Sequence, residues 1–341
     1  MRLGYSLLGT VALCAIAAAT AAAANNWMPP KTAWGDPDLQ GAWTSDDSIG
    51  VPFERPRRYG TRKLLTDEEY AEREKENVLI SNSVQKGTIP NAGYWIEREG
   101  VDAQPYSSNW TEYARRTSRQ TSLIVEPEDG HFASLTPQAA YQRVATIAAA
   151  RKKPLPESWE DLSMYARCIS RGVLGSMLPV IYGNGTHILQ SPGLVVIRYE
   201  MIHETRIIPI DPPGHPRPHL PAGIRTYMGD PRGRWEGSTL VVETTNFIGD
   251  RLGIGDNGEG VRYSEDLRLI ERFTRHDETS IQYEATVNDP KTFTAPWTVA
   301  FPITRESGYQ IFEYACHEGN YAMANMLSEA RAEEKAAAAH K

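Results

Sequence analysis

The chain has few cysteines, no excess of positive charge and, beyond its first 24 residues, no long apolar run. A helix that crosses a membrane needs roughly 20 consecutive apolar residues, so no membrane span is expected. The 36 basic and 43 acidic side chains are interspersed and leave a formal net charge of -7. Because nucleic acid and anionic membrane surfaces are not attracted to such a field, we expect neither as a partner.

The N-terminal segment is typical of a cleavable secretion signal. Arg2 precedes a short apolar run, and the alanines at 21–24 form a small-residue cleavage site. The run is too short for a transmembrane anchor. A lipoprotein acylated at Cys14 is disfavoured, because Leu13 stands where a small residue is expected. Residues 1–24 are therefore predicted to be a signal peptide, and the mature protein to be periplasmic or secreted.

Removal of the signal takes one of the three cysteines with it and leaves Cys168 and Cys316. In an oxidising compartment two remaining cysteines indicate one disulfide. It would close a loop of about 150 residues and, in the chain-entropy model, stabilise the fold by about 4 to 5 kcal/mol. Two buried free thiols and a nucleophilic cysteine are the alternatives.

The composition and the predicted secondary structure change along the chain and divide it into four zones after the signal. Helix start signals occur at Thr66, with a capping box to Glu69, and at Thr136, which precedes a proline. A further helix is predicted from Ser158 toward Cys168. The predicted zones are an extended segment with a first strand (25–60), a largely helical region packing on the sheet (61–168), an antiparallel β domain (169–320) and a C-terminal helix with a frayed tail (321–341).

The β zone predicts the architecture. Residues 194–199 are apolar on both faces and continue into the alternating stretch 200–211, while 234–247 reads as a hairpin. Strands follow one another through short turns, so the fold is predicted to be mainly β with an added helical region (α+β). An antiparallel meander closing into a lipocalin-like barrel is expected, with residues 41–43 as the closing strand; a two-sheet β-sandwich is the alternative.

Two resemblances support these predictions. The strings GRWEGSTLVVETTNF (233–247), EYACHEGNY (313–321) and EMIHETRII (200–208) resemble those of a large family of exported bacterial proteins without an assigned activity. That resemblance covers most of residues 165–331 and implies export, but it brings no mechanism. The Gly-x-Trp at 41–43 and the Trp-Glu-Gly-x-Thr-Leu hairpin are similar to calycin and lipocalin barrels, which implies a barrel.

Three positions combine ionisable side chains with β-patterned apolar sequence. His203 lies in the alternating stretch and is either a general base or a core histidine with one partner. If the chain turns after Glu318, His317 or Glu318 could face a cavity with Asn320; otherwise the segment only anchors the last strand. Glu243, among apolar residues, needs a partner such as Arg206, Arg234 or a histidine, or else a raised pKa.

These residues lead to two kinds of site. A proton-transfer site, with a histidine base and an orienting carboxylate, is favoured over a divalent metal site of two histidines and a carboxylate, because no His-x-His or His-x-x-x-His spacing supports the metal. No cofactor is therefore expected. The predicted catalytic residues are His203, Glu243, His317 and Glu318, and the predicted substrate-binding residues are Arg206, Trp235, Asn320 and Tyr321.

The function predicted from these observations is an exported hydrolase or lyase that uses acid/base chemistry on a small organic or carbohydrate substrate. A non-catalytic barrel that binds a small apolar or sugar ligand is the main alternative, and a cell-envelope interaction protein is a third. The prolines of 212–221, interleaved with His215 and His219, predict a rigid extended loop that either covers a cavity or braces the sheet.

Overall fold

The computed structural model describes residues 27–86, 112–153, 155–255, 258, 260–306 and 308–339, so the predicted signal peptide lies outside the described residues. The strands are β1 (Gly41–Thr44), β2 (Ile124–Glu126), β3 (Gly185–Ser191), β4 (Leu194–Tyr199), β5 (Thr205–Pro209), β6 (Asp230–Glu236), β7 (Thr239–Thr245), β8 (Gly253–Ile254), β9 (Val261–Arg262), β10 (Arg268–Arg275), β11 (Ser280–Asn288) and β12 (Trp297–Thr304). The α-helices are α1 (Asp67–Gln85), α2 (Pro137–Lys152), α3 (Gly172–Met177) and α4 (Tyr321–Ala339).

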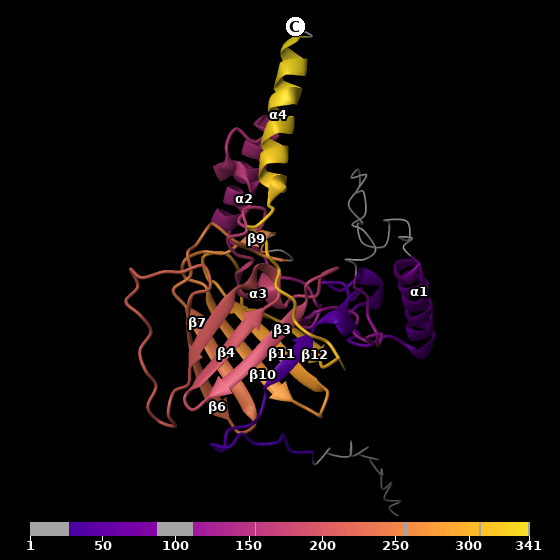
Figure 1. Cartoon of the computed structure of the whole chain (residues 1–341), viewed down its shortest axis with the longest axis vertical. Coiled ribbons are helices and arrows are strands. Elements are labelled where there is room, and N and C mark those ends of the chain that lie inside the picture. Colours follow the sequence, from indigo (N-terminus) through magenta and orange to yellow (C-terminus); the bar gives the residue numbers. More distant parts are fainter. Residues whose placement is uncertain are drawn as a thin grey trace, which may run out of the picture.

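Nine strands form a nearly closed antiparallel barrel (Figure 1), in the order β5-β4-β3-β1-β12-β11-β10-β7-β6, and β2 pairs with β12 outside this path. The two end strands meet where Ile210 and Gly233 form a parallel bridge and the amide of Asp211 donates to the Gly233 carbonyl at 2.7 Å. The predicted barrel is confirmed. Strand β1 joins β3 to β12, as expected of a closing strand from far upstream.

Every second side chain along the strands points into the barrel and fills it. Along β10 every second residue is buried, and β11 alternates in the same way. Large side chains of five strands meet inside with at most 1% exposure: Trp43, Tyr199, Phe273, Tyr283 and Phe301. A barrel of this size either holds a ligand or is filled by side chains, and these inward-facing residues fill it. Beside α3 lies a cavity of about 10 Å³, enough for one water molecule.

The stretch 200–211, predicted as one continuation of the preceding strand, contains a reversal. A 3₁₀ turn occupies Met201–His203, and both Ile202 (φ 60°) and His203 (φ 45°) adopt left-handed conformations that a strand cannot contain. The cause is the pairing of β4 with β5 as antiparallel neighbours, which requires the chain to turn back between them. Apolar and polar residues alternate on both sides of the turn, so the sequence pattern did not reveal that the strand is interrupted there.

The helical predictions are confirmed in part. Thr136 caps α2 by accepting a hydrogen bond from the amide of Ala139 at 3.2 Å, as predicted. Ser158 forms a capping box, but it opens only a 3₁₀ turn, Trp159–Asp161, because Leu162 is already extended. The zone predicted to be largely helical contains strand β2 as well as α1 and α2.

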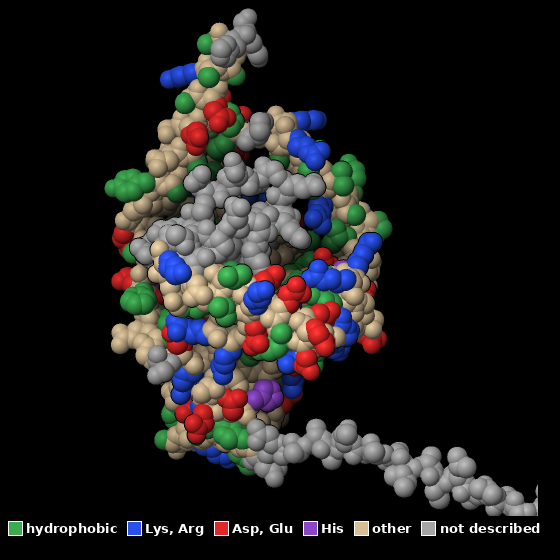
Figure 2. Space-filling view, turned by 90° about the vertical axis from the view of Figure 1, so that its right-hand side faces the viewer, with side chains coloured by type: hydrophobic (Ala, Val, Ile, Leu, Met, Phe, Trp, Pro, Cys, Tyr) green, Lys and Arg blue, Asp and Glu red, His purple; other side chains and the backbone are tan. Residues whose placement is uncertain are grey.

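The predicted disulfide between Cys168 and Cys316 is present, with Cα atoms 5.8 Å apart. It ties the segment before α3 to the segment that follows β12. Helices α2 and α4 project from the end of the barrel near α3 (Figure 1). Figure 2 shows acidic and basic side chains interspersed over one face of the molecule, in line with the charge pattern of the sequence. In the described part of the chain, no helix is long and apolar enough to cross a membrane.

Candidate functional site

The structure does not bring the predicted catalytic residues together. His203 is exposed, and its Nδ1 lies 3.1 Å from the carbonyl oxygen of Tyr314. His317 and Glu318 are exposed in the turn that follows the disulfide. All these residues are described, and no hydrogen bond or ion pair joins His203, His317 or Glu318 to Glu243.

The predicted substrate-binding residues are also dispersed. Arg206 points into the barrel and is buried there, while Trp235 is half-buried on β6. The side-chain amide of Asn320 lies 3.2 Å from the Sγ of Cys168, so it packs on the disulfide. Tyr321 is 75% exposed at the start of α4.

Glu243 has the partners that the sequence analysis required. It lies on the outer face of β7, and its carboxylate accepts two hydrogen bonds from Arg268 on β10, at 2.8 and 2.7 Å. These bonds lower the pKa of Glu243 and keep it ionised. On its other side the carboxylate faces His219, with 3.7 Å between Oε1 and Nε2. An arginine and a histidine are thus both present, but the arginines predicted as partners pair elsewhere: Arg206 with Glu271 and Arg234 with Glu236.

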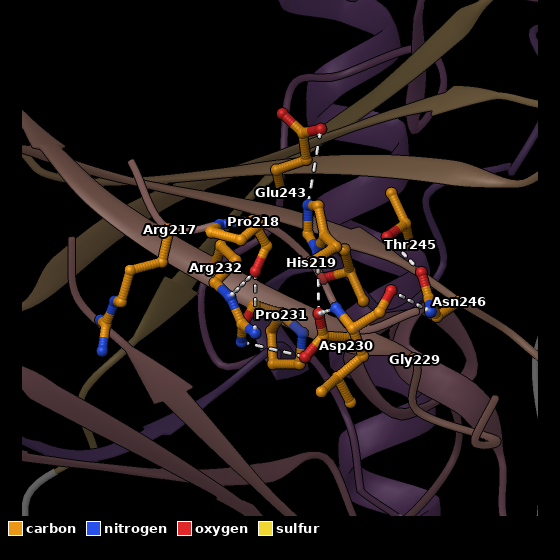
Figure 3. Close-up of polar contacts among 12 residues, drawn as sticks. Arg217, Pro218, His219, Gly229, Asp230, Pro231, Arg232, Glu243, Thr245 and Asn246 are labelled. Carbon is orange, nitrogen blue, oxygen red and sulfur yellow. Dashed lines mark hydrogen bonds and ion pairs between the residues drawn. The ribbon is translucent and has the colours of Figure 1, made fainter. Parts of the chain in front are cut away.

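His219 is held by a second carboxylate, that of Asp230 (Figure 3). Its Nδ1 lies 2.9 Å from Oδ2 of Asp230, which also accepts the backbone amide of Leu220 at 2.9 Å. The other oxygen of Asp230 pairs with Arg232 at 2.9 Å. Since Asp230 is almost fully buried and Arg232 is anchored to the backbone of Pro218, the position of the imidazole is fixed on this side.

Strand alternation places these groups on one surface. In the β6–β7 pair, Asp230 stands opposite Thr245 and Arg232 opposite Glu243, so their side chains share the outer face. The loop between β5 and β6, residues 210–229, carries His219 back over this face. The site, defined as His219, Asp230, Arg232, Glu243 and Arg268, is therefore built from three neighbouring strands and one loop.

The arrangement suits proton transfer. Asp230 favours the tautomer in which Nδ1 of His219 carries the proton, leaving Nε2 as the free acceptor. The 3.7 Å between Nε2 and Glu243 is longer than a hydrogen bond. The His219 side chain is 25% exposed, so solvent reaches it. An imidazole between two carboxylates can accept a proton and be stabilised as imidazolium while it holds it.

A second group of ionisable side chains lies where β1 ends and β3 begins. The Asn184 amide donates to Asp46 at 2.8 Å and to Glu112 at 2.9 Å, and the two carboxyls are hydrogen-bonded to each other. Burial, and then the charge of Asp46, raise the pKa of Glu112 to about 9. Nearby, Tyr309 donates to Glu200. Asp46 and Glu200 are 5% and 8% exposed, so this carboxyl cluster is less accessible than His219.

Sequence reasoning missed His219, Asp230, Arg232 and Arg268 as site residues. The alternation of β6 puts Asp230 on the face of Arg232, a signal that the sequence analysis did not use. The proline-rich loop was recognised, but its return onto β7 is a non-local contact. Within the described ranges, no group of three or more His, Cys, Asp and Glu side chains is arranged to hold a metal ion. Comparisons of the chain with protein-family models, curated protein sequences and solved structures found no match.

Proposed function

We propose that the protein is an exported hydrolase or lyase that performs acid/base chemistry at His219 on a small organic or carbohydrate substrate. The observation that carries this proposal is the hydrogen bond from His219 to buried Asp230, which leaves Nε2 available as the acceptor on a side chain that is 25% exposed. A disulfide, which persists in oxidising compartments, supports export.

In the proposed reaction Nε2 of His219 removes a proton from water or from the substrate. Asp230 keeps the imidazole oriented and stabilises the imidazolium that forms, as does ionised Glu243. The proton is then returned to the leaving group. Arg268 and Arg232 hold the two carboxylates in place, so the negative charge that favours the imidazolium stays next to it.

The chain without residues 1–24, assayed on p-nitrophenyl esters and glycosides, tests the proposal. For a substrate that is turned over, His219→Gln should lower kcat by roughly 10² to 10⁴, the usual contribution of a general base. His276→Gln, an exposed histidine outside the site, is the matched control and should leave kcat unchanged. Turnover that survives His219→Gln would contradict the proposal. Absence of turnover on the whole panel would favour the non-catalytic binding protein.

A further inference from the structure

The loop that carries His219 is attached to the barrel at only a few points. Residues 212–218 are exposed, and the prolines among them remove backbone donors. The attachment to Asp230 involves His219 itself and the amide of Leu220. Segments held by a few polar contacts open at a lower free energy than the core. The position of the imidazole therefore depends on what else fastens the loop.

The side-chain nitrogen of Asn246, the residue after β7, lies 3.0 Å from the carbonyl oxygen of Leu220, 3.1 Å from that of Pro221 and 3.0 Å from that of Ile224. The hydroxyl of Thr245 donates to Oδ1 of Asn246 at 2.9 Å, which orients the amide toward the loop. One side chain thus contacts three carbonyls on the stretch that immediately follows His219, those of Leu220, Pro221 and Ile224.

The backbone of Asn246 takes part as well. Its carbonyl accepts the amide of Thr226 at 3.1 Å, and the Thr226 carbonyl accepts the amide of Ile248 at 3.0 Å. Asn246 has φ 59°, a left-handed conformation that asparagine adopts more readily than most residues. Both its side chain and its backbone therefore fasten the loop beside the strand that carries Glu243.

We propose that residues 212–224 form a lid over Glu243, and that Asn246 is the latch that holds it closed. This inference rests on the proposed function. In the closed form Nε2 of His219 faces Glu243 at 3.7 Å, so a substrate does not fit between these two groups. The lid lifts to admit the substrate beside Nε2 and then closes, which returns the imidazole to Asp230 for the proton transfer. Asn246 is a positioning residue, because it acts through His219.

The accessibility of His219 tests the latch without any turnover. Diethyl pyrocarbonate acylates neutral imidazole nitrogens, and peptide mass spectrometry reads each histidine separately. Asn246→Asp keeps the size and the left-handed conformation but cannot donate to the three carbonyls. In this variant we expect His219 to be modified at least tenfold faster, relative to His276 in the same molecule. Asn325→Asp, on exposed α4, is the charge-matched control and should leave the ratio unchanged.

An unchanged ratio in Asn246→Asp and in Asn246→Gly, both with native circular dichroism, would overturn the latch. If neither variant folds, hydrogen exchange of the unmodified protein decides. The amides of Leu220 and Thr226 should exchange by local opening, at least tenfold faster than that of Val242 on β7. Exchange of all three only by global unfolding would overturn the lid. Failure of the proposed function would appear separately, as turnover that survives His219→Gln.

Discussion

Arg206 and Glu271 form a two-pronged ion pair inside the barrel, with Nη1–Oε1 at 3.0 Å and Nη2–Oε2 at 2.6 Å and side-chain exposures of 1% and 0%. Arg206 also donates to the hydroxyls of Tyr199 and Thr244 at 3.2 and 3.1 Å, and the hydroxyl of Tyr283 donates to Glu271 at 3.0 Å. Burial alone would lower the pKa of Arg206, but the carboxylate of Glu271 outweighs it and raises that pKa. The pair is thus a buried unit of the core in which Glu271 keeps Arg206 charged.

Loss of one partner of this pair should be more costly than loss of both. Arg206→Met leaves the charge of Glu271 buried without its counter-ion, and we expect a loss of about 3 to 5 kcal/mol in the free energy of unfolding. The double variant Arg206→Met with Glu271→Met removes both charges and should recover part of that loss. Urea denaturation of the two variants measures it. A double variant less stable than the single one would contradict a core ion pair.

The sequence predicted the fold better than the site, for a physical reason. Period-two burial is a local property, so the barrel and the inward position shared by Arg206 and Ile208 follow from alternation alone. The disulfide was predictable because only two cysteines follow the signal. That Glu243 needs a partner could also be predicted locally, from the apolar residues around it in the sequence. Its partner His219 lies in the loop between β5 and β6, and no local sequence pattern predicts which strand such a loop contacts.

Asp230→Asn should impair the site without removing the imidazole. The amide is neutral, so it neither favours the Nδ1–H tautomer as strongly nor stabilises the imidazolium. We expect kcat to fall by roughly 10² while the barrel keeps its circular dichroism. Asp211→Asn is the matched control, because Asp211 holds Arg217 at 2.7 Å at the base of the same loop but does not touch His219. Equal losses in both variants would indicate an effect on the loop alone.

The carboxyl cluster predicts how stability depends on pH. Above the ordinary pKa of 4.5 the unfolded chain releases the Glu112 proton, whereas the folded protein keeps it until about pH 9. Fewer protons on the unfolded state mean that stability falls as pH rises, so this contribution is complete below pH 4.5 and lost by about pH 9. Thermal unfolding between pH 5 and pH 9 should show the decline.

The variant Glu112→Gln isolates the contribution of Glu112 to the pH dependence of stability from that of the other titrating residues. The glutamine amide can accept from Asn184 and donate to Asp46, but it does not titrate. Its melting temperature should therefore decline less from pH 5 to pH 9 than that of the unmodified protein. Glu160→Gln, on an exposed turn, serves as the control. Identical slopes in Glu112→Gln and the unmodified protein would show that Glu112 ionises normally.

The disulfide should protect the segment between β12 and α4 more than it protects the barrel. Besides Cys316, this segment is held through Tyr309 and Phe312, which both contact Glu200, and through the Tyr314 carbonyl, which contacts His203. The side chain of Phe312 is itself 69% exposed, so a protease that cleaves after aromatic residues can reach it once the backbone loosens.

The matched test replaces Cys168 and Cys316 together by alanine. In the chain-entropy model the free energy of unfolding falls by about 4 to 5 kcal/mol. Limited chymotrypsin digestion should then cut near Phe312 at least tenfold faster and release α4, while the barrel resists because its strand pairing does not include this segment. Thiol titration of the unfolded chain without residues 1–24, with both cysteines in place, should find no free thiol before reduction and two after it. Digestion that starts in the barrel would contradict the stronger protection of the segment between β12 and α4.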